Sequence, residues 1–353
     1  MQAEVNLIIP PKERKIESLE NEHLCTQFLA DLKNAEHVNV FCICGNSYSL
    51  EFFKQLEMHA TKLKSVRKLV LSDIFTSRKE EIIPSLEIID RLFSNKNIVM
   101  LDFSYNALCP DGCATIVNMI KTNRTLQYLY LNHVALSQAG TVSICDAIKE
   151  GELDLISFQA IKNRIEIQAV KVAEVVARMP SLEELILYQN NIKDEQMDAL
   201  FDALKNCPNL KSLDISDNYI KTDSMEHLIG LLDSCKELRV LKIGDCNIEE
   251  KDTKKLIQFL KEIKTIKLEL FTYNYNDVDN IDKLVEVLAE YKELKMFECK
   301  GLGFEDDEIE VLKNKLPNVE CTFESEDEEE EVKITDKQSK IDQLMDEFLH
   351  LTI

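Results

Sequence analysis

The sequence has 353 residues, 45% of them hydrophobic, and a formal net charge of −22 from 42 basic and 64 acidic side chains. This acidic balance argues against a nucleic-acid-binding surface, which needs clustered Lys and Arg to displace counterions from phosphates. It favours a basic protein partner, or serves solubility alone.

Several sequence patterns are missing, and their absence narrows the possible classes of protein further. No stretch approaches the roughly 18 uncharged apolar residues of a membrane-spanning helix, and the start of the chain lacks the pattern of a secretory signal. The 11 Cys are scattered, mostly in apolar runs, as expected for buried thiols in a reducing compartment. We find no P-loop, GxSxG, HExxH or paired CxxC motif. We therefore expect a soluble cytoplasmic protein without cofactor, metal or membrane insertion, and without an active site of its own.

The first segment, residues 1–37, is predicted to be an N-terminal cap. The stretch "SLENEHLCTQFLADLKN" has helical spacing. The end unit of a repeat protein needs a polar outer side, which this stretch supplies.

Residues 38–319 repeat one pattern. "LEELILYQNNI", "LKSLDISDNYI" and "LRVLKIGDCNI" fit LxxLxLxx(N/C)x(L/I), and each starts 28 residues after the previous one. This is the leucine-rich-repeat signature. Extending it in both directions predicts about ten repeats, which start at Val38, Val66, Ile98, Leu126, Leu155, Leu182, Leu210, Leu238, Ile266 and Leu294.

The repeat has a direct physical interpretation. Leucines at positions 1, 4 and 6 point inward from a short strand, and the Asn at position 9 satisfies backbone groups in the turn. The second half of each unit has helical spacing. We therefore predict an α/β leucine-rich-repeat solenoid, a horseshoe with parallel strands on the inner face and helices on the outer face. In the unit from Ile266, Glu269 falls at an inward position, so a register slip is expected there. The predicted position-9 residues are Asn106, Asn163, Asn190, Asn218 and Asn274.

One stretch interrupts the repeat. "LSDIFTSRKEEIIP" begins at Leu71, and it lies in the single long interval, 32 residues instead of about 28. The extra residues predict a loop released from repeat packing, where recognition residues commonly lie. We expect Phe75 to turn inward and anchor this loop, and Arg78 and Lys79 to face solvent.

Residues 320–353 are predicted to form an acidic tail and a short amphipathic helix. "ESEDEEEE" holds seven acids in eight residues, which is typical of a solvated, self-repelling segment. Further on, "KIDQLMDEFLHL" places apolar residues on one helical stripe. This stripe either packs back on the repeats or docks on a partner.

The interrupting stretch also carries a resemblance. "SDIFTSRKEEIIP" closely resembles the signature SDIFTGR-x-x-[DE]EIP of Ran GTPase-activating proteins, which are leucine-rich-repeat proteins of the ribonuclease-inhibitor type. The stretches "LYLNHVALSQAG", "FQAIKNRIE", "IGDCNI" and "FECKGLGFEDDE" resemble later family motifs in the same order, and an acidic tail follows. The resemblance covers about residues 35–353.

The resemblance implies a function and partners. The protein would bind a Ran-type small GTPase in its GTP form and stimulate hydrolysis by positioning the GTPase's own Gln, with the nucleotide, magnesium and water supplied by the GTPase. It would act as a monomer in nucleocytoplasmic transport, in the cytoplasm or at the nuclear envelope, and a Ran-binding protein could take part.

The resemblance also implies roles for individual residues. Arg78 matches the signature arginine; it is assigned to the catalytic residues and would organise the loop that meets Ran. Val134 stands where the family carries its critical Asn, so the neighbouring Asn132 is assigned that catalytic role. Asp245 would face a Ran lysine. The remaining residues assigned to partner binding are Lys79, Asn163 and Arg164.

Two other functions stay open. The chain could be a leucine-rich-repeat scaffold that has lost GTPase activation, or an inhibitor-type binding module with an unrelated partner. For each site residue, a purely local role in a repeat turn is the alternative.

Overall fold

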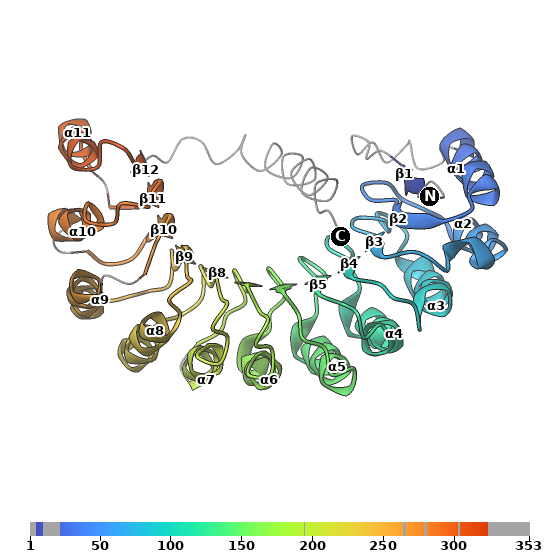
Figure 1. Ribbon diagram of the computed structural model, residues 1–353, viewed down its shortest axis with the longest axis horizontal. Helices are drawn as coiled ribbons and strands as arrows, with labels where there is room; N and C mark the ends of the chain where they lie inside the picture. The colour runs from blue at the N-terminus through green and yellow to red at the C-terminus, as the bar shows by residue number, and fades with distance from the viewer. Residues whose placement is uncertain are drawn as a thin grey trace.

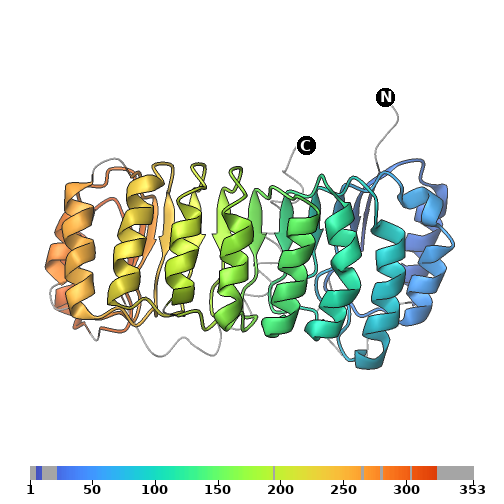
Figure 2. The same cartoon turned by 90° about the horizontal axis from the view of Figure 1, so that it is seen from below.

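The computed structural model describes residues 5–9, 22–193, 195–263, 266–278, 281–302 and 304–323. These residues form one curved solenoid, with short parallel strands on the inner face and helices outside them (Figure 1). Seen from below, the helices stand side by side along the convex surface (Figure 2). The predicted α/β leucine-rich-repeat horseshoe is confirmed.

The described part of the chain contains twelve strands in a single sheet. Their bounds are β1 (Val5–Ile8), β2 (Val38–Cys42), β3 (Lys68–Val70), β4 (Met100–Asp102), β5 (Tyr128–Tyr130), β6 (Ser157–Gln159), β7 (Glu184–Ile186), β8 (Ser212–Asp214), β9 (Val240–Lys242), β10 (Leu270–Thr272), β11 (Met296–Glu298) and β12 (Glu320–Thr322).

The helices alternate with these strands along the chain. The α-helices are α1 (Glu22–Asn34), α2 (Leu50–Glu57), α3 (Ile82–Phe93), α4 (Cys109–Thr122), α5 (Ser137–Glu150), α6 (Ala169–Val176), α7 (Glu195–Leu204), α8 (Thr222–Ser234), α9 (Glu250–Glu262), α10 (Ile281–Leu288) and α11 (Asp306–Lys315). Three 3₁₀ helices are η2 (Ala60–Leu63), η3 (Lys79–Glu81) and η4 (Glu166–Gln168).

The sheet has the simplest order a solenoid allows. Strands follow one another from β1 to β12, and each pairs in parallel with its neighbours in sequence. The middle residues of the strands are in register, as in the pairs Leu129↔Phe158 and Leu185↔Leu213. Because all strands run the same way, their carboxyl ends lie along one edge of the sheet, which we call the carboxyl edge.

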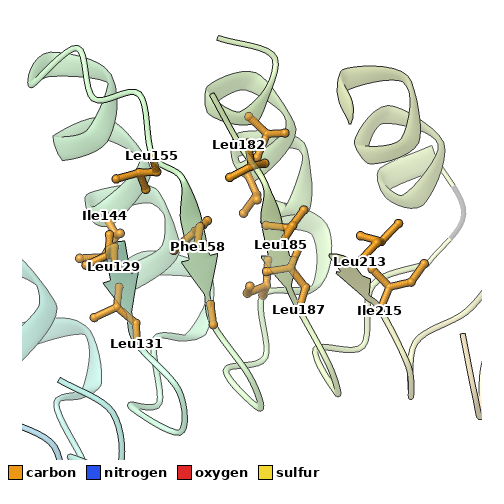
Figure 3. Packing of buried hydrophobic residues seen from close by; sticks show 14 of the residues in the cluster. Leu129, Leu131, Ile144, Leu155, Phe158, Leu182, Leu185, Leu187, Leu213 and Ile215 are labelled. Atoms are coloured by element: carbon orange, nitrogen blue, oxygen red, sulfur yellow. The ribbon is translucent and has the colours of Figure 1, made fainter. Parts of the chain in front are cut away.

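The core lies between the sheet and the helices. Leucines and other apolar residues at positions 1, 4 and 6 of each repeat are fully buried there, and successive repeats stack the same positions on one another (Figure 3). Leu185, for example, packs between the equivalent residues Phe158 and Leu213 on the flanking strands. A repeat therefore buries its apolar face only with the help of its neighbours.

Buried asparagines shape the turns at the carboxyl edge. Asn218 Nδ2 donates to the carbonyls of Leu187 and Ile215, while its Oδ1 accepts from the Ile192 N–H. Asn106 and Asn190 are bonded in the same way to the preceding repeat. These amides satisfy backbone groups that no strand reaches, as the sequence pattern predicted.

The register of one repeat differs from the prediction made from its spacing. Phe271 pairs with Leu241 and Phe297, so the unit starts at Leu268 rather than Ile266. Asn276, and not Asn274, takes position 9: its Oδ1 accepts from Cys246 N, and its Nδ2 donates to Ile243 O. With this shift Glu269 leaves the core and forms ion pairs with Arg239 and Lys295. The expected register slip is confirmed.

The sheet extends beyond the predicted repeat segment 38–319 at both ends. Strand β1 lies within the predicted cap 1–37 and pairs with β2, and the predicted cap helix corresponds to α1. Strand β12 lies within the predicted tail 320–353 and pairs with β11. The acidic run and the apolar stripe of the tail lie outside the described residues.

Candidate partner-binding site

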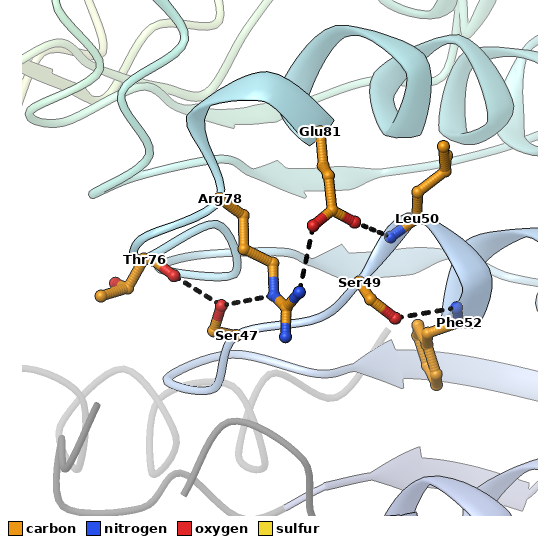
Figure 4. Close-up of polar contacts among 7 residues, drawn as sticks. All are labelled: Ser47, Ser49, Leu50, Phe52, Thr76, Arg78 and Glu81. Carbon is orange, nitrogen blue, oxygen red and sulfur yellow. Dashed lines mark hydrogen bonds and ion pairs between the residues drawn. The ribbon is translucent and has the colours of Figure 1, made fainter. Parts of the chain in front are cut away.

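The unusual loop between β3 and α3 is held by a polar network around Arg78 (Figure 4). Ser47 Oγ donates to Thr76 O over 2.6 Å and accepts from Arg78 Nε over 3.1 Å. The guanidinium also reaches Glu81 Oε1 over 3.1 Å. The Arg78 side chain therefore joins the turn after β2 to the loop after β3.

Glu81 extends the network to α2, the preceding helix. Its Oε2 accepts the Leu50 N–H over 2.5 Å, at the first turn of α2. This backbone hydrogen bond, followed by the Arg78 guanidinium, holds the pKa of the Glu81 carboxyl below its usual value. The ionised carboxylate is therefore the form that this loop stabilises.

The loop residues are placed partly as expected. Phe75 is buried and packs on Phe53 with ring centroids 5.8 Å apart, so its anchoring role is confirmed. Lys79 is exposed. The expectation that Arg78 faces solvent is wrong, because its side chain is only 13% exposed and is shared between Ser47 and Glu81. Spacing alone gave no sign of Ser47, which lies 31 residues away in another repeat.

Asn132 follows β5 at the carboxyl edge and is largely buried. Its Oδ1 accepts from Ile161 N over 2.9 Å, and its Nδ2 donates to Gln159 Oε1 over 3.0 Å. Asn274 holds the equivalent place after β10 and accepts from Lys300 N over 2.8 Å. Asn132 is thus one of two amides that bridge to the next strand at this position.

Val134, two residues further on, occupies position 9 of its repeat and is fully buried. It interrupts the series of position-9 asparagines. The next member, Asn163, makes the usual contacts to the preceding turn: its Oδ1 accepts from the N–H groups of Val134 and Leu136, and its Nδ2 donates to Leu131 O. The amide of Asn163, assigned to partner binding from the resemblance, is therefore occupied by backbone groups.

Basic residues stand on the turn after β6. Arg164 and Lys162 are both exposed and both have left-handed backbone, with φ of 56° and 54°. The Lys162 ammonium lies 5.6 Å from the centre of the Tyr188 ring in the next repeat. The turn presents two cations beyond the buried Asn163.

Acidic residues stand on two turns further along the same edge. Asp245 is exposed after β9, and Asp217 occupies the equivalent place after β8. Burial and the charge of Asp245 together raise the pKa of the Asp217 carboxyl. The two carboxylates therefore form a local centre of negative charge, and a bound cation would reduce the repulsion between them.

All the predicted site residues follow strands and lie along the carboxyl edge. Neighbouring strands are about 4.8 Å apart, so the loops after β3 and β5 are separated by about 10 Å along the sheet. The turn after β9 lies about 19 Å beyond the turn after β5. One partner of ordinary size can therefore span Arg78, Asn132, Arg164 and Asp245.

Aromatic residues on this edge were missed from the sequence. The rings of Tyr105, after β4, and His133, next to Asn132 after β5, stack with centroids 4.9 Å apart. Tyr219 and Tyr275 are exposed on later turns. These rings fall at positions 8 or 10 of their repeats, on either side of the position-9 residue. That placement was a signal that could have identified them from the sequence.

Comparison with known proteins agrees with this architecture. The family model for leucine-rich repeats (two copies) matches residues 180–230. Together with the parallel strand–helix units of the fold, this match decides the class.

The described part of the chain is a leucine-rich-repeat solenoid.

Two curated relatives share a more specific name. This leucine-rich-repeat protein is 25% identical over 193 residues to "Ran GTPase-activating protein 2" of Caenorhabditis elegans, covering 50% of this chain and 20% of the relative. It is 26% identical over 213 residues to "Ran GTPase-activating protein" of Drosophila melanogaster, covering 54% of this chain and 35% of the relative. The matched part is therefore a fifth to about a third of the relatives' length. The predicted resemblance to this family is confirmed, as that of a divergent sequence.

Two solved structures are similar to this chain at low sequence identity. A leucine-rich-repeat protein from Leptospira interrogans is 17% identical, with 84% of this chain and 74% of that chain covered and a TM-score of 0.44. An internalin from Listeria monocytogenes is 16% identical, with 84% and 89% covered and a TM-score of 0.44.

The described residues lack two further features. Among them, no helix is both long and apolar enough to cross a membrane. The same part of the chain contains no group of three or more His, Cys, Asp or Glu side chains arranged to hold a metal ion.

Proposed function

We propose that this leucine-rich-repeat protein is a GTPase-activating protein for a Ran-type small GTPase. The observation that carries the proposal is the ordered loop around Arg78, in the segment that resembles the signature of Ran GTPase-activating proteins. The names of the two curated relatives support it. The activity would belong to nucleocytoplasmic transport, in the cytoplasm or at the nuclear envelope.

In this proposal Arg78 acts by shaping the loop. Activators of many GTPases insert an arginine into the nucleotide site. Arg78 is a poor candidate for that role, because its guanidinium is already shared between Ser47 and Glu81 and is largely covered. The exposed neighbour Lys79 and the rest of the loop would then meet the GTPase, with Arg78 fixing their conformation.

The catalytic group in this proposal is Asn132. Its amide would hold the GTPase's catalytic Gln, and hence the attacking water, in position. To do so it must exchange part of its bonding to Gln159 and Ile161 for the partner. Asp245 would meet a basic side chain of the GTPase, and the net charge of −22 favours a basic partner surface in general.

Two observations favour a second candidate, a scaffold that binds the GTPase without activating it. Both polar atoms of the Asn132 amide are engaged inside the protein, and Val134 holds the position of the family's critical Asn. A protein with these features could keep the binding edge and lack the catalytic group.

Single-turnover hydrolysis distinguishes these functions. Ran loaded with γ-labelled GTP is mixed with a hundredth of an equivalent of this protein, and phosphate release is followed against an unrelated GTP-loaded small GTPase. The proposal predicts an acceleration of roughly 10³-fold or more, typical of GTPase activators, for Ran alone. Binding of Ran·GTP at the intrinsic hydrolysis rate would select the scaffold, and no binding would select an unrelated partner.

A further inference from the structure

Two thiols lie in contact at the carboxyl end of β2. Cys42 Sγ and Cys44 Sγ are 3.5 Å apart. They are two residues apart on extended chain, so both side chains point to the same face of the sheet. This is the concave face, where they belong to a small apolar cluster with Val40, Val70 and Met100.

The pair differs from the other cysteines in its electrostatics. The hydrogen bond from Cys44 is the main cause that lowers the pKa of the Cys42 thiol, and the same contact raises the pKa of Cys44. Burial raises the pKa of most other thiols, to about 12 at Cys113 and Cys207. Both thiols are buried, Cys42 at 0% and Cys44 at 2% exposure, so the oxidant that reaches them must be small. Of the two, Cys42 is the nucleophile, because the thiolate is the reactive form and its contact with Cys44 favours it there.

We propose that Cys42 and Cys44 form a reversible oxidation site that closes to a disulfide with a hydroperoxide as oxidant. The Cys42 thiolate attacks one peroxide oxygen, an S–O bond forms, the O–O bond breaks, and hydroxide leaves and takes up a proton. The Cys44 thiol then attacks the Cys42 sulfenic acid, the S–S bond forms, and the S–O bond breaks with loss of water. The two thiols supply two electrons, and one hydrogen peroxide becomes two waters.

The position of the pair makes this bond easy to reduce again. Residues two apart on a strand have Cα atoms about 6.6 Å apart, near the upper end of the range found for disulfides. Closing the bond therefore strains the end of β2. Strained disulfides have higher reduction potentials than structural ones, so ordinary thiols should reopen this one.

The strain falls on the turn that holds Arg78. Asn46 Nδ2 donates to Cys44 O over 3.1 Å, and Gly45 N donates to Ser72 O over 3.0 Å. Ser47, which bonds to Arg78 and to the Thr76 carbonyl, comes next. Oxidation would therefore shift the turn that positions Arg78. This consequence rests on the proposed function, whereas the oxidation site itself does not.

Peptide mapping tests the oxidation site. The tryptic peptide 34–54 contains no other cysteine than Cys42 and Cys44. The folded full-length chain is treated with hydrogen peroxide, denatured, and alkylated with N-ethylmaleimide. We expect this peptide to become 2 Da lighter and unalkylated, while Cys207 and Cys235 remain alkylated, and dithiothreitol before alkylation should restore both labels.

Two matched variants show whether the mass change depends on this pair of thiols. Cys44→Ser should stop the disulfide and leave Cys42 as a reversible sulfenic acid, detected by trapping with dimedone. Cys207→Ser, at another buried thiol, should leave the mass change intact. Full alkylation of both Cys42 and Cys44 in the oxidised wild-type chain would overturn the proposal, and this result does not depend on how any variant folds.

The hydrolysis assay tests separately whether the disulfide affects GTPase activation. If the reduced chain activates Ran, we expect the oxidised chain to activate it at least tenfold less, with recovery after reduction. An unchanged rate in a chain shown by mass to hold the disulfide would overturn the link to Arg78. Absence of activation by the reduced chain would count against the proposed function and leave the mass result standing.

Discussion

Arg78 Nε donates to Ser47 Oγ over 3.1 Å, a bond that joins two successive repeats at the carboxyl edge. The same hydroxyl donates to Thr76 O, so one serine fixes both the arginine and the loop backbone. This arrangement gives the extra residues after β3 a defined conformation although they lie outside the repeat pattern.

The first prediction concerns this bond. Ser47→Ala removes the acceptor of Arg78 Nε and should reduce GTPase activation about as much as Arg78→Ala does, because both changes release the same loop. The melting temperature should also fall moderately in Ser47→Ala, because Ser47 is buried and its loss leaves Arg78 Nε and the Thr76 carbonyl without this partner, at about 1–3 kcal/mol. Single-turnover rates and melting curves of both variants check this. Ser49→Ala removes the N-cap of α2 and no contact of Arg78, so it is the control for the rate.

A strong loss in Arg78→Ala with none in Ser47→Ala would contradict the positioning role. It would mean that the guanidinium itself meets the partner.

The second prediction is a pH dependence of the same network. The pKa of Glu81 is lowered in the folded chain, so its contribution to stability is present above the unfolded value near 4.5 and is lost as pH falls through the folded value. Glu81→Gln should therefore lower the melting temperature at pH 6 and have progressively less effect toward pH 3. Melting of both chains across this range measures the difference.

The exposed acid Glu80 provides the control, since no part of the network includes it. A Glu81→Gln effect that stays constant with pH would show that the carboxylate charge does not stabilise the loop.

The third prediction compares two asparagines that hold equivalent positions. Asn132→Ala and Asn274→Ala each remove one bridge to the next strand and should cost similar stability, about 1–3 kcal/mol for the backbone group left without its partner. If Asn132 positions the GTPase's Gln, only Asn132→Ala should lower the hydrolysis rate, by about 10²–10³-fold. Hydrolysis rates at saturating activator check the difference.

Val134→Asn completes that comparison. Val134 is fully buried in the turn, so an Asn there should enter the local hydrogen bonds and leave the rate within about twofold. A rise in rate with Val134→Asn, together with a silent Asn132→Ala, would identify the chain as a weakened activator.

The fourth prediction concerns charge at the far end of the edge. Asp245→Lys should slow association with Ran·GTP at low salt by about tenfold, and the difference should shrink as salt screens the charges. Asp154→Lys changes the net charge equally at an exposed residue that belongs to no proposed contact. Stopped-flow association of both variants at several salt concentrations is the measurement, and equal rates would remove Asp245 from the interface.

Much of the fold could be predicted from the sequence, because the repeat places Leu185 and Leu213 in the same core position 28 residues apart. The register around Phe271 was less clear, since Ile266 and Leu268 both fit position 1 and only the pairing of strands decides. The partners of Arg78 could not be predicted, because Ser47 belongs to another repeat and its spacing carries no signal. For Asn163, the turn position predicted contacts with backbone groups, and the resemblance predicted partner binding. The amide makes the backbone contacts of the turn.

The hydrolysis rate of Ran·GTP with a hundredth of an equivalent of this protein tests the central claim most directly, measured side by side for the wild-type chain and Arg78→Ala. We predict multiple turnovers per molecule of the wild-type chain, an acceleration of roughly 10³-fold or more, and a large loss in Arg78→Ala at unchanged folding. Hydrolysis at the intrinsic rate with the wild-type chain, under conditions where it binds Ran·GTP, would contradict the proposed activation.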